Sequence, residues 1–441
     1  MIYNCAVDGG NASINIIIDG DKFPIAFPSL QSDPLSAKSD YTNAVNMENL
    51  SKVEYDKLHV NVEQHSNDPN KKDEAEFLFG HMAEKYTRDL RSRQNFEKAS
   101  DRELAKWMIT ALAYSLYVVK SNREDYTIKE GDILTFHVNL GTGLPYREKS
   151  KKENVDSFAG MFQGKHKVEF KHPIFKNLVV ELIIENVIVF TEAEMALSLE
   201  LNKENGIFET MTPEELLGKK MSIIDIGGHT TESLTIGYEL ARKEEELQLG
   251  TFIDEYSLSD IEVEQKTLTH LTFGIERGIA TIMEDVIAEI DNEYRGTGKQ
   301  LRTFVRRDIE KSLTKQGMLN GKVGYILPEK IYVKDIFDSQ AKNLAVDIVQ
   351  KTHAIYQAHN IVSEIDTIFL CGGGSKIDIV TKTIRDEFEK LGYDKNKIQL
   401  IEDPVFANVK GYYFNLIYSL QTQGLMDDLV YEEENVEEIS S

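Results

Sequence analysis

The sequence predicts an α/β fold made of two similar lobes that flank a cleft. Residues 5–18 and residues 222–236 share one pattern, in which a buried strand runs into an Asp-x-Gly turn and then into a second strand. A third glycine turn, at Gly372, follows a buried strand and leads into a helix. Repetition of one supersecondary unit about two hundred residues apart indicates a duplicated fold.

Composition and net charge indicate a globular protein and limit its expected partners. The chain has 441 residues, of which 41% are hydrophobic and 28% charged, as in ordinary globular proteins. Its formal net charge of −24 repels phosphate backbones, so we expect no direct binding to nucleic acid. No apolar run approaches the ~18 residues that cross a bilayer, and no basic leader is present, so we expect a cytoplasmic protein. The cysteines, Cys5 and Cys371, are expected to be buried and reduced.

The first lobe is expected to contain an insertion and a long helix. Polar residues dominate residues 28–95, but apolar side chains return near Phe79, which predicts a small inserted subdomain. Ser100 and Glu103 have the spacing of a capping box and predict a helix over residues 101–120.

Strands and a second helix follow in the same lobe. Residues 133–140 and 178–190 are apolar, strand-like runs, whereas residues 147–164 are charged and are expected to form a hairpin. Thr191 and Glu194 match a second capping box and predict the start of a helix.

The second lobe repeats this order of elements. Helices are predicted over residues 279–294, 333–359 and 378–391. Seven acidic residues near the end of the chain predict a solvated tail. The predicted organisation is a first lobe at 1–210 plus 405–425, a second lobe at 211–404 and an acidic tail at 426–441.

The first two glycine turns have the composition of a phosphate clasp. Glycine lets backbone N–H groups approach a polyphosphate without a clash from Cβ. Asp8 and Asp225 would repel phosphate directly, but they fit a hydrated Mg²⁺, which binds through few carboxylates. One such turn could be an ordinary hairpin, whereas two matching turns and a third favour a nucleotide. Neither a P-loop nor a Rossmann fingerprint is present.

The third turn, Gly372-Gly373-Gly374-Ser375, joins a buried strand to a helix. Helix N-termini favour anions, and a bare glycine backbone can lie flat against a base or a sugar. A tight strand-to-helix connection is the alternative, but it would rarely need three consecutive glycines.

Together the three turns resemble the phosphate 1, phosphate 2 and adenosine motifs shared by actins, heat-shock chaperone ATPases and sugar kinases. Residues 79–83, 143–145 and 403–413 further resemble segments of ParM-type plasmid-segregation actins. This resemblance to the actin-like superfamily implies a duplicated, ribonuclease H-like fold whose two lobes flank a nucleotide cleft.

The resemblance also implies roles for individual residues. Asp8 and Asp225 would lie near the metal and its waters. The remaining contacts that it implies are Gly10, Asn11, Ala12 and Ser13 on the β-phosphate; Gly227, Gly228, His229 and Thr230 on the γ-phosphate; Gly372, Gly373, Gly374 and Ser375 along the adenosine; and Gly274 and Glu276 at the ribose.

Glu192 and Asp225 are the catalytic candidates. Residues 187–192 resemble the corner between a strand and a helix at which such ATPases hold a carboxylate that orients the attacking water. Alternatively, Glu192 only stabilises the dipole of a following helix. Asn15 stands where the family usually has a lysine aimed at the β-phosphate; an amide donates a hydrogen bond but brings no charge. With Asn15 in place of that lysine, we expect either a lower nucleotide affinity or another cation of the chain at the β-phosphate.

The function implied by the resemblance is an ATPase, with GTP as a possible alternative nucleotide and Mg²⁺ as its metal. It would form filaments of itself that move plasmid DNA through a DNA-bound adaptor of the ParR type, without contacting a membrane. The rival from another class is a small-molecule kinase on the same fold, which would stay dispersed in the presence of ATP. A chaperone would need a further domain, and a membrane-tethered division actin would need a basic amphipathic helix in place of the acidic tail.

Overall fold

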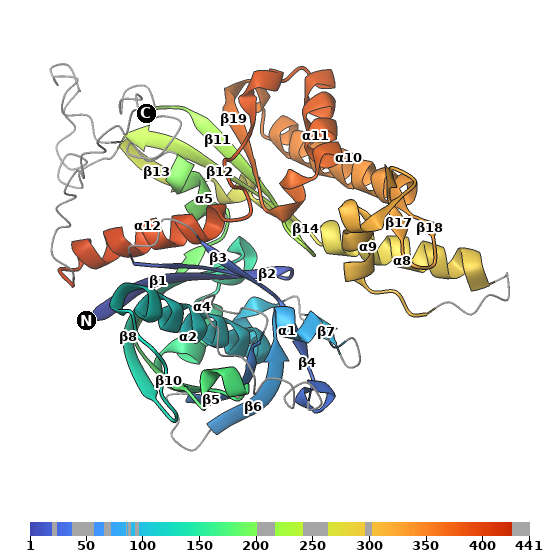
Figure 1. The fold of residues 1–441 in the computed structure, drawn as a ribbon. Helices are drawn as coiled ribbons and strands as arrows, with labels where there is room; N and C mark the ends of the chain where they lie inside the picture. Colours follow the sequence, from blue (N-terminus) through green and yellow to red (C-terminus); the bar gives the residue numbers. More distant parts are fainter. Residues whose placement is uncertain are drawn as a thin grey trace, which may run out of the picture.

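The computed structural model describes residues 1–19, 24–37, 57–65, 72–84, 86, 90–92, 97–200, 217–240, 263–295 and 302–425. These residues form two α/β lobes, which lie one above the other in Figure 1. The predicted α/β class with two lobes is therefore confirmed. The predicted acidic tail and the predicted lobe boundary near residue 210 lie outside the described residues.

The first lobe is built on a sheet of ten strands in the order β3-β2-β1-β8-β10-β9-β5-β6-β4-β7. The bounds of these strands are β1 Ile2–Gly9, β2 Ser13–Ile18, β3 Ile25–Pro28, β4 Leu30–Ser32, β5 His59–His65, β6 Lys72–Phe79, β7 Arg91–Ser92, β8 Ile133–Leu144, β9 Gly164–Phe170 and β10 Val179–Thr191. Strand β5 comes from the segment that the sequence assigns to an inserted subdomain, and it pairs with β9. The described strands of that segment thus extend the main sheet.

The helices of the first lobe correct two local predictions. They are α1 His81–Glu84, α2 Arg102–Glu124, α3 Tyr146–Lys149 and α4 Lys152–Phe162. The long helix is present, but Ser100 does not cap it: Asp101 is the N-cap, and its carboxylate accepts a hydrogen bond of 3.0 Å from the backbone N of Leu104. The predicted hairpin over residues 147–164 is wrong, because this segment forms α3 and α4, and α4 buries Phe158 and Phe162 on one face.

The second lobe repeats the strand pairing around the first turn. Its sheet has the order β13-β12-β11-β19-β20, and β14 also pairs with β12. The strands are β11 Lys220–Ile226, β12 Thr231–Leu240, β13 Val263–Thr267, β14 Phe273–Ile275, β19 Ile365–Cys371 and β20 Ile398–Leu400. Strand β1 pairs with β2 antiparallel and with β8 parallel, and β11 pairs in the same way with β12 and β19. The duplication inferred from the sequence is therefore present in the hydrogen-bond ladders.

Three helices of the second lobe match the predicted ranges closely, and a short helix over residues 306–312 was not predicted. These helices are α8 Ile279–Arg295, α9 Arg306–Ser312, α10 Lys334–Ala358 and α11 Asp378–Lys390. Helix α9 and the short strands near residues 318–332 lie beside α8 at the outer end of this lobe (Figure 1). These strands are β15 Met318–Leu319, β16 Lys322–Val323, β17 Tyr325–Ile326 and β18 Ile331–Tyr332.

Two helices cross between the lobes. Helix α12 (Ala407–Thr422) follows the second lobe in sequence, yet its Val409 and Tyr412 pack with Ala6 and Ile17 of the first sheet. Helix α5 (Glu194–Glu200) follows the first lobe, yet it packs in one cluster with Met221 and other residues of the second sheet. Each sheet is thus covered partly by a helix that follows the other sheet in sequence.

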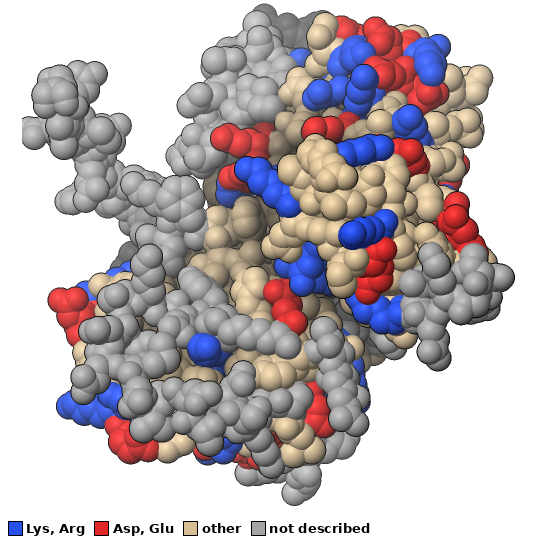
Figure 2. All heavy atoms as spheres, turned by 45° about the vertical axis from the view of Figure 1, so that its right-hand side comes forward, with Lys and Arg blue, Asp and Glu red and all other residues tan. Residues whose placement is uncertain are grey.

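The surface carries both signs of charge. On the face shown in Figure 2, basic and acidic side chains of the upper lobe lie interspersed and form no patch of one sign. Across the described parts of the chain, no helix has the length and apolarity needed to span a membrane.

Candidate functional site

The two Asp-x-Gly turns have the same backbone geometry. The backbone N of Gly10 donates a hydrogen bond of 2.9 Å to the carbonyl of Ser13, and Gly227 N donates one of 2.9 Å to Thr230 O. A Cβ at Gly10 would lie 2.8 Å from Ser13 O, and a Cβ at Gly227 would lie 2.9 Å from Thr230 O. Both turns therefore require glycine at the equivalent position.

The two turns also touch each other across the lobes. A Cβ at Gly228 would lie 3.1 Å from the Cβ of Asn11. Asp8, which lies near the end of β1, is 8% exposed, and its charge raises the pKa of Asp225 in addition to the larger effect of burial. The structure thus brings together the two aspartates that the sequence assigns to a metal.

Gly278, a residue that the sequence analysis missed, fixes the second turn to α8. A Cβ at Gly278 would lie 2.5 Å from the carbonyl oxygens of both Gly227 and Gly228. The same carbonyls accept hydrogen bonds from the first residues of the helix, at 3.1 Å from Ile279 N and 2.7 Å from Ala280 N. The proximity of Gly278 to the second turn could not be inferred from the sequence, because about fifty residues separate the two.

The third turn converges on the same place. Gly372 has φ = 80°, and a Cβ there would lie 2.2 Å from Asp225 Oδ1. Gly374 packs against Ile226 and Ile279, and Ser375 Oγ donates a hydrogen bond of 2.7 Å to Gly372 O. All three glycine turns therefore surround one point between the lobes.

Four carboxylates gather at this point: Asp8, Glu192, Asp225 and Glu232. Burial raises the pKa of Glu192, and the charges of Asp8 and Glu232 raise it further against the opposing charge of Lys98. Burial, followed by the charge of Asp225, raises the pKa of Glu232 to about 7. Burial is the largest cause of both shifts and the neighbouring carboxylates add to it, so a cation would stabilise the ionised groups here.

Lys98 provides one cation, and the sequence analysis missed it. Its ammonium group contacts Glu192 Oε1 and lies 3.5 Å from Asp8 Oδ1, and the side chain is 7% exposed. Lys98 lies in the 3-10 turn Lys98–Ser100 before α2, where Glu148 accepts hydrogen bonds from Lys98 N at 3.1 Å and Ala99 N at 2.7 Å. No local sequence pattern marks this lysine, because the site is assembled from distant segments.

Asn15 and Glu232 occupy equivalent positions in the two hairpins. Asn15 lies directly opposite Asp8 across β1 and β2, and Glu232 lies opposite Asp225 across β11 and β12. Asn15 Nδ2 donates to the carbonyl of Val405 at 3.2 Å. Alignment of the two predicted turns could have identified Glu232 in advance, since it has the same spacing from its aspartate.

Three other residues predicted to contact the nucleotide, His229, Gly274 and Glu276, differ in their surroundings. His229 is buried, and its Nε2 is 3.0 Å from Arg306 NH1, a second cation beside the second turn. Gly274 lies opposite Glu232 in the pairing of β14 with β12. Glu276 is directed to the surface, where its 85% exposed side chain forms a 3.2 Å ion pair with Arg147 of the first lobe.

The donor set at the centre fits a magnesium ion held through water. Within the described ranges, no group of three or more His, Cys, Asp or Glu side chains is arranged to enclose a metal directly. Asp8 and Asp225 supply the hard oxygen donors that Mg²⁺ prefers, and Mg²⁺ keeps several waters when few carboxylates bind it. A divalent cation would also offset the excess of carboxylates over lysine.

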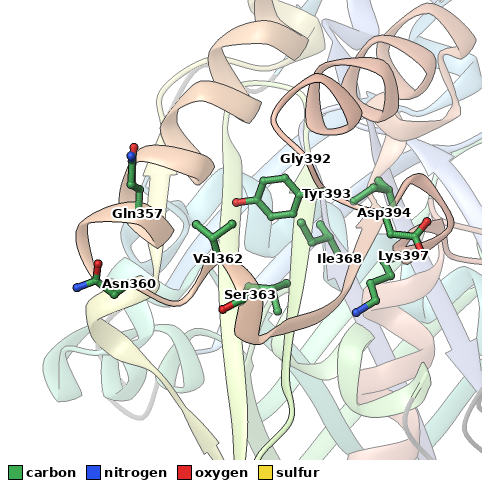
Figure 3. A pocket seen from close by; sticks show the side chains of 11 residues that line it. Gln357, Asn360, Val362, Ser363, Ile368, Gly392, Tyr393, Asp394 and Lys397 are labelled. Atoms are coloured by element: carbon green, nitrogen blue, oxygen red, sulfur yellow. The ribbon is translucent and has the colours of Figure 1, made fainter.

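A separate cavity of about 530 Å³ lies at the other end of β19 (Figure 3). Its walls include Ile365 and Ile368, whereas the glycine turn follows Cys371 at the end of the strand. The charged side chains in its lining are Asp394 and Lys397. None of the three glycine turns lines this cavity, and Asp394 is the one carboxylate in its lining, so it is distinct from the candidate site.

Solved structures share this arrangement of lobes over nearly the whole chain. Actin-like protein Alp7A superposes with a TM-score of 0.62 at 16% identity, covering 96% of this chain and 99% of that chain. A 15-stranded ParM filament from Clostridium botulinum gives a TM-score of 0.61 at 18% identity, covering 95% and 99%. The fold is that of the ParM-type actin-like proteins. ParM from Bacillus thuringiensis, solved with ATP, superposes at 0.53 with 16% identity, covering 95% and 99%.

The likeness to ParM-type actin-like proteins is one of fold. No protein-family model matches the sequence, and no curated protein matches it. The three glycine turns nevertheless meet between the two lobes of this ParM-type fold, which is the place where the sequence analysis expected a nucleotide.

Proposed function

We propose that this chain is an ATP-dependent, filament-forming protein of the cytoplasm that segregates plasmid DNA through an adaptor, with ATP hydrolysis driving filament turnover. The observation that carries the proposal is the contact between the two matched turns at Asn11 and Gly228, beside the buried carboxylates. A polyphosphate held there would bind to both lobes at once.

Different groups of the chain would bind the phosphates, the nucleoside and the metal. The turns around Gly10 and Gly227 present glycine backbone to the phosphates, and the turn at Gly372 lies along the nucleoside. Asp8 and Asp225 would hold the waters of Mg²⁺. When bound, Mg²⁺ neutralises phosphate charge and favours in-line attack by water.

Glu192 is the proposed water-orienting residue. It directly follows β10, which ends at Thr191, and α5 begins only at Glu194, so Glu194 and not Glu192 occupies the first helical turn. Glu192 is buried among the other carboxylates of the site. Both features favour a role at the phosphates over a role at the helix dipole.

Assembly would follow from closure of the cleft. Nucleotide bound by both lobes fixes their relative position, and a fixed protomer can present two different, complementary surfaces to its neighbours. Such head-to-tail contacts produce open filaments, and the ParM from Clostridium botulinum with a similar fold was solved as a filament. The net charge of −24 favours a basic, DNA-bound adaptor of the ParR type as the link to plasmid DNA.

Light scattering tests this proposal on the full chain. Adding ATP and Mg²⁺ should raise the scattered intensity, which should decline as ATP is consumed, whereas a non-hydrolysable ATP analogue should hold it high. ADP serves as the control and should give little scattering. A chain that consumes ATP but stays dispersed would instead be a non-polymerising ATPase or a kinase.

A further inference from the structure

Lys98 is a buried cation between Asp8, which the proposed function places at Mg²⁺, and Glu192, which it places at the attacking water. Its Nζ lies 3.5 Å from Asp8 Oδ1 and closer to Glu192 Oε1. Both carboxylates are themselves largely buried, with side chains 11% and 13% exposed. The ammonium group of a lysine in such surroundings is stabilised by the neighbouring carboxylates, because little water reaches it.

Asn15 does not provide this charge. Its amide nitrogen donates to Val405 O at 3.2 Å, and an amide carries no positive charge in any case. The second cation near the turns, Arg306, is engaged with His229 at 3.0 Å and with Glu284 at 3.6 Å. Of the lysines that the structure describes, Lys98 is therefore the one best placed to meet a phosphate near Asp8.

We propose that Lys98 binds the terminal phosphate of the nucleotide, and that it leaves Glu192 when it does so. This inference rests on the proposed function. An ammonium group is a compact charge with three donors, so a phosphate oxygen competes directly with a carboxylate for it. Release from Lys98 frees Glu192 to accept a hydrogen bond from water, which couples nucleotide binding to activation of the site.

The backbone of the 3-10 turn supports this exchange. Glu148 accepts hydrogen bonds from the backbone N of both Lys98 and Ala99, which holds the turn in place at its start. Only the side chain of Lys98 has to move, because a lysine has four rotatable bonds in its stem. Glu148 thereby acts as a positioning residue for Lys98.

Equilibrium binding of two nucleotides tests the assignment. In Lys98→Gln, affinity for a non-hydrolysable ATP analogue with Mg²⁺ should fall about 10- to 100-fold, the scale of one charge-assisted hydrogen bond, while affinity for Mg²⁺-ADP should fall less than about threefold. Lys98→Arg should restore part of the loss. Equal losses for both nucleotides, or no loss, would overturn the inference. Failure of the wild-type chain to bind either nucleotide would instead refute the proposed function.

Lys106→Gln is the matched control. Lys106 lies on α2, its side chain is 11% exposed, and it pairs with Asp73 at 2.6 Å, outside the carboxylate cluster. The variant should therefore bind both nucleotides as the wild type does. A loss of affinity for the ATP analogue alone in Lys106→Gln would contradict the assignment to Lys98.

Thermal unfolding with Mg²⁺ alone gives a readout that needs no nucleotide. Lys98→Gln leaves the carboxylates without their cation, so Mg²⁺ should raise its melting temperature more than that of the wild type. Lys98→Gln/Glu192→Gln removes one charge of each sign, so it should recover stability yet still discriminate poorly between the two nucleotides. Restored discrimination in the double variant would contradict phosphate binding by Lys98.

Discussion

Asn408 connects Asp225 of the second lobe to the start of α5. Its Nδ2 donates a hydrogen bond of 2.8 Å to Asp225 Oδ2, and its Oδ1 accepts one of 3.0 Å from the backbone N of Ala193. Asn408 lies in the first turn of α12, so both crossing helices meet at the proposed metal ligand. One amide thus links the position of Asp225 to the arrangement of the lobes.

Asn408→Ala should lower both stability and hydrolysis. It leaves a buried carboxylate and a backbone N–H without their partner, which costs about 1–3 kcal/mol of the free energy of unfolding. Urea unfolding measures this loss, and a phosphate-release assay measures turnover. Asn415→Ala is the control, because among the described residues the side chain of Asn415, on the same helix, bonds only to Gly411 O, at 2.8 Å. Equal effects of the two substitutions on turnover would argue against the link.

Glu192→Gln should separate assembly from hydrolysis. An amide keeps the shape of the side chain but has no negative charge and accepts a weaker hydrogen bond from water, so ATP turnover should fall by about 100-fold or more. Filaments should form with ATP and persist, which appears as a scattering plateau that does not decline. Glu194→Gln is the control for the helix dipole, since Glu194 occupies the first turn of α5. Unchanged turnover in Glu192→Gln would remove this residue from the mechanism.

Gly278→Ala should disrupt the second turn. The new Cβ would lie 2.5 Å from the carbonyls of Gly227 and Gly228, and backbone cannot move aside as a flexible side chain can. We expect a loss of about 1–3 kcal/mol in stability and a marked loss of nucleotide affinity. Gly160→Ala is the control: it lies in α4, where a Cβ meets no heavy atom within 4 Å, and it should stabilise the helix by about 0.5–1 kcal/mol. Normal nucleotide binding by Gly278→Ala would contradict the proposed role of this turn.

Because its carboxylate is buried, Glu200 should make the free energy of unfolding depend on pH. Burial, and then the charge of Glu402, raise its pKa from 4.5 to about 7 against the opposing charge of Lys410. Between these values the native state binds more protons than the unfolded state, so this group makes stability fall as the pH rises. Glu200→Gln removes that cost, and should raise the free energy of unfolding by about 2 kcal/mol at about pH 8 and by less at about pH 5.5. A gain independent of pH would show that ionisation of Glu200 is not its cause.

The elements that local sequence encodes were predictable. Asp8 and Asp225 could be assigned to equivalent turns because each begins a short glycine hairpin, and the structure places both at one point. The hairpin predicted over residues 147–164 was wrong, but the local sequence could have corrected it, since Val155, Phe158 and Phe162 have helical spacing.

The partners of these turns were not predictable, because they come from distant segments. Lys98 lies 90 residues after Asp8, and Asn408 lies 183 residues after Asp225. Gly278 needs glycine only because another backbone passes close to it. Ser100 resembled a cap, but Asp101 is the N-cap, since either residue type can cap a helix and the two are adjacent in the sequence.

The exchange of helices between the lobes bears on how the protein is made. A ribosome releases the first sheet long before α12, whose Val409 and Tyr412 cover Ala6 and Ile17. Those apolar residues stay uncovered until α12 is synthesised, so the first lobe cannot complete its packing alone during synthesis. Expressing either lobe as a separate fragment should therefore yield an aggregating product, and co-expression of both fragments should be needed to recover folded material.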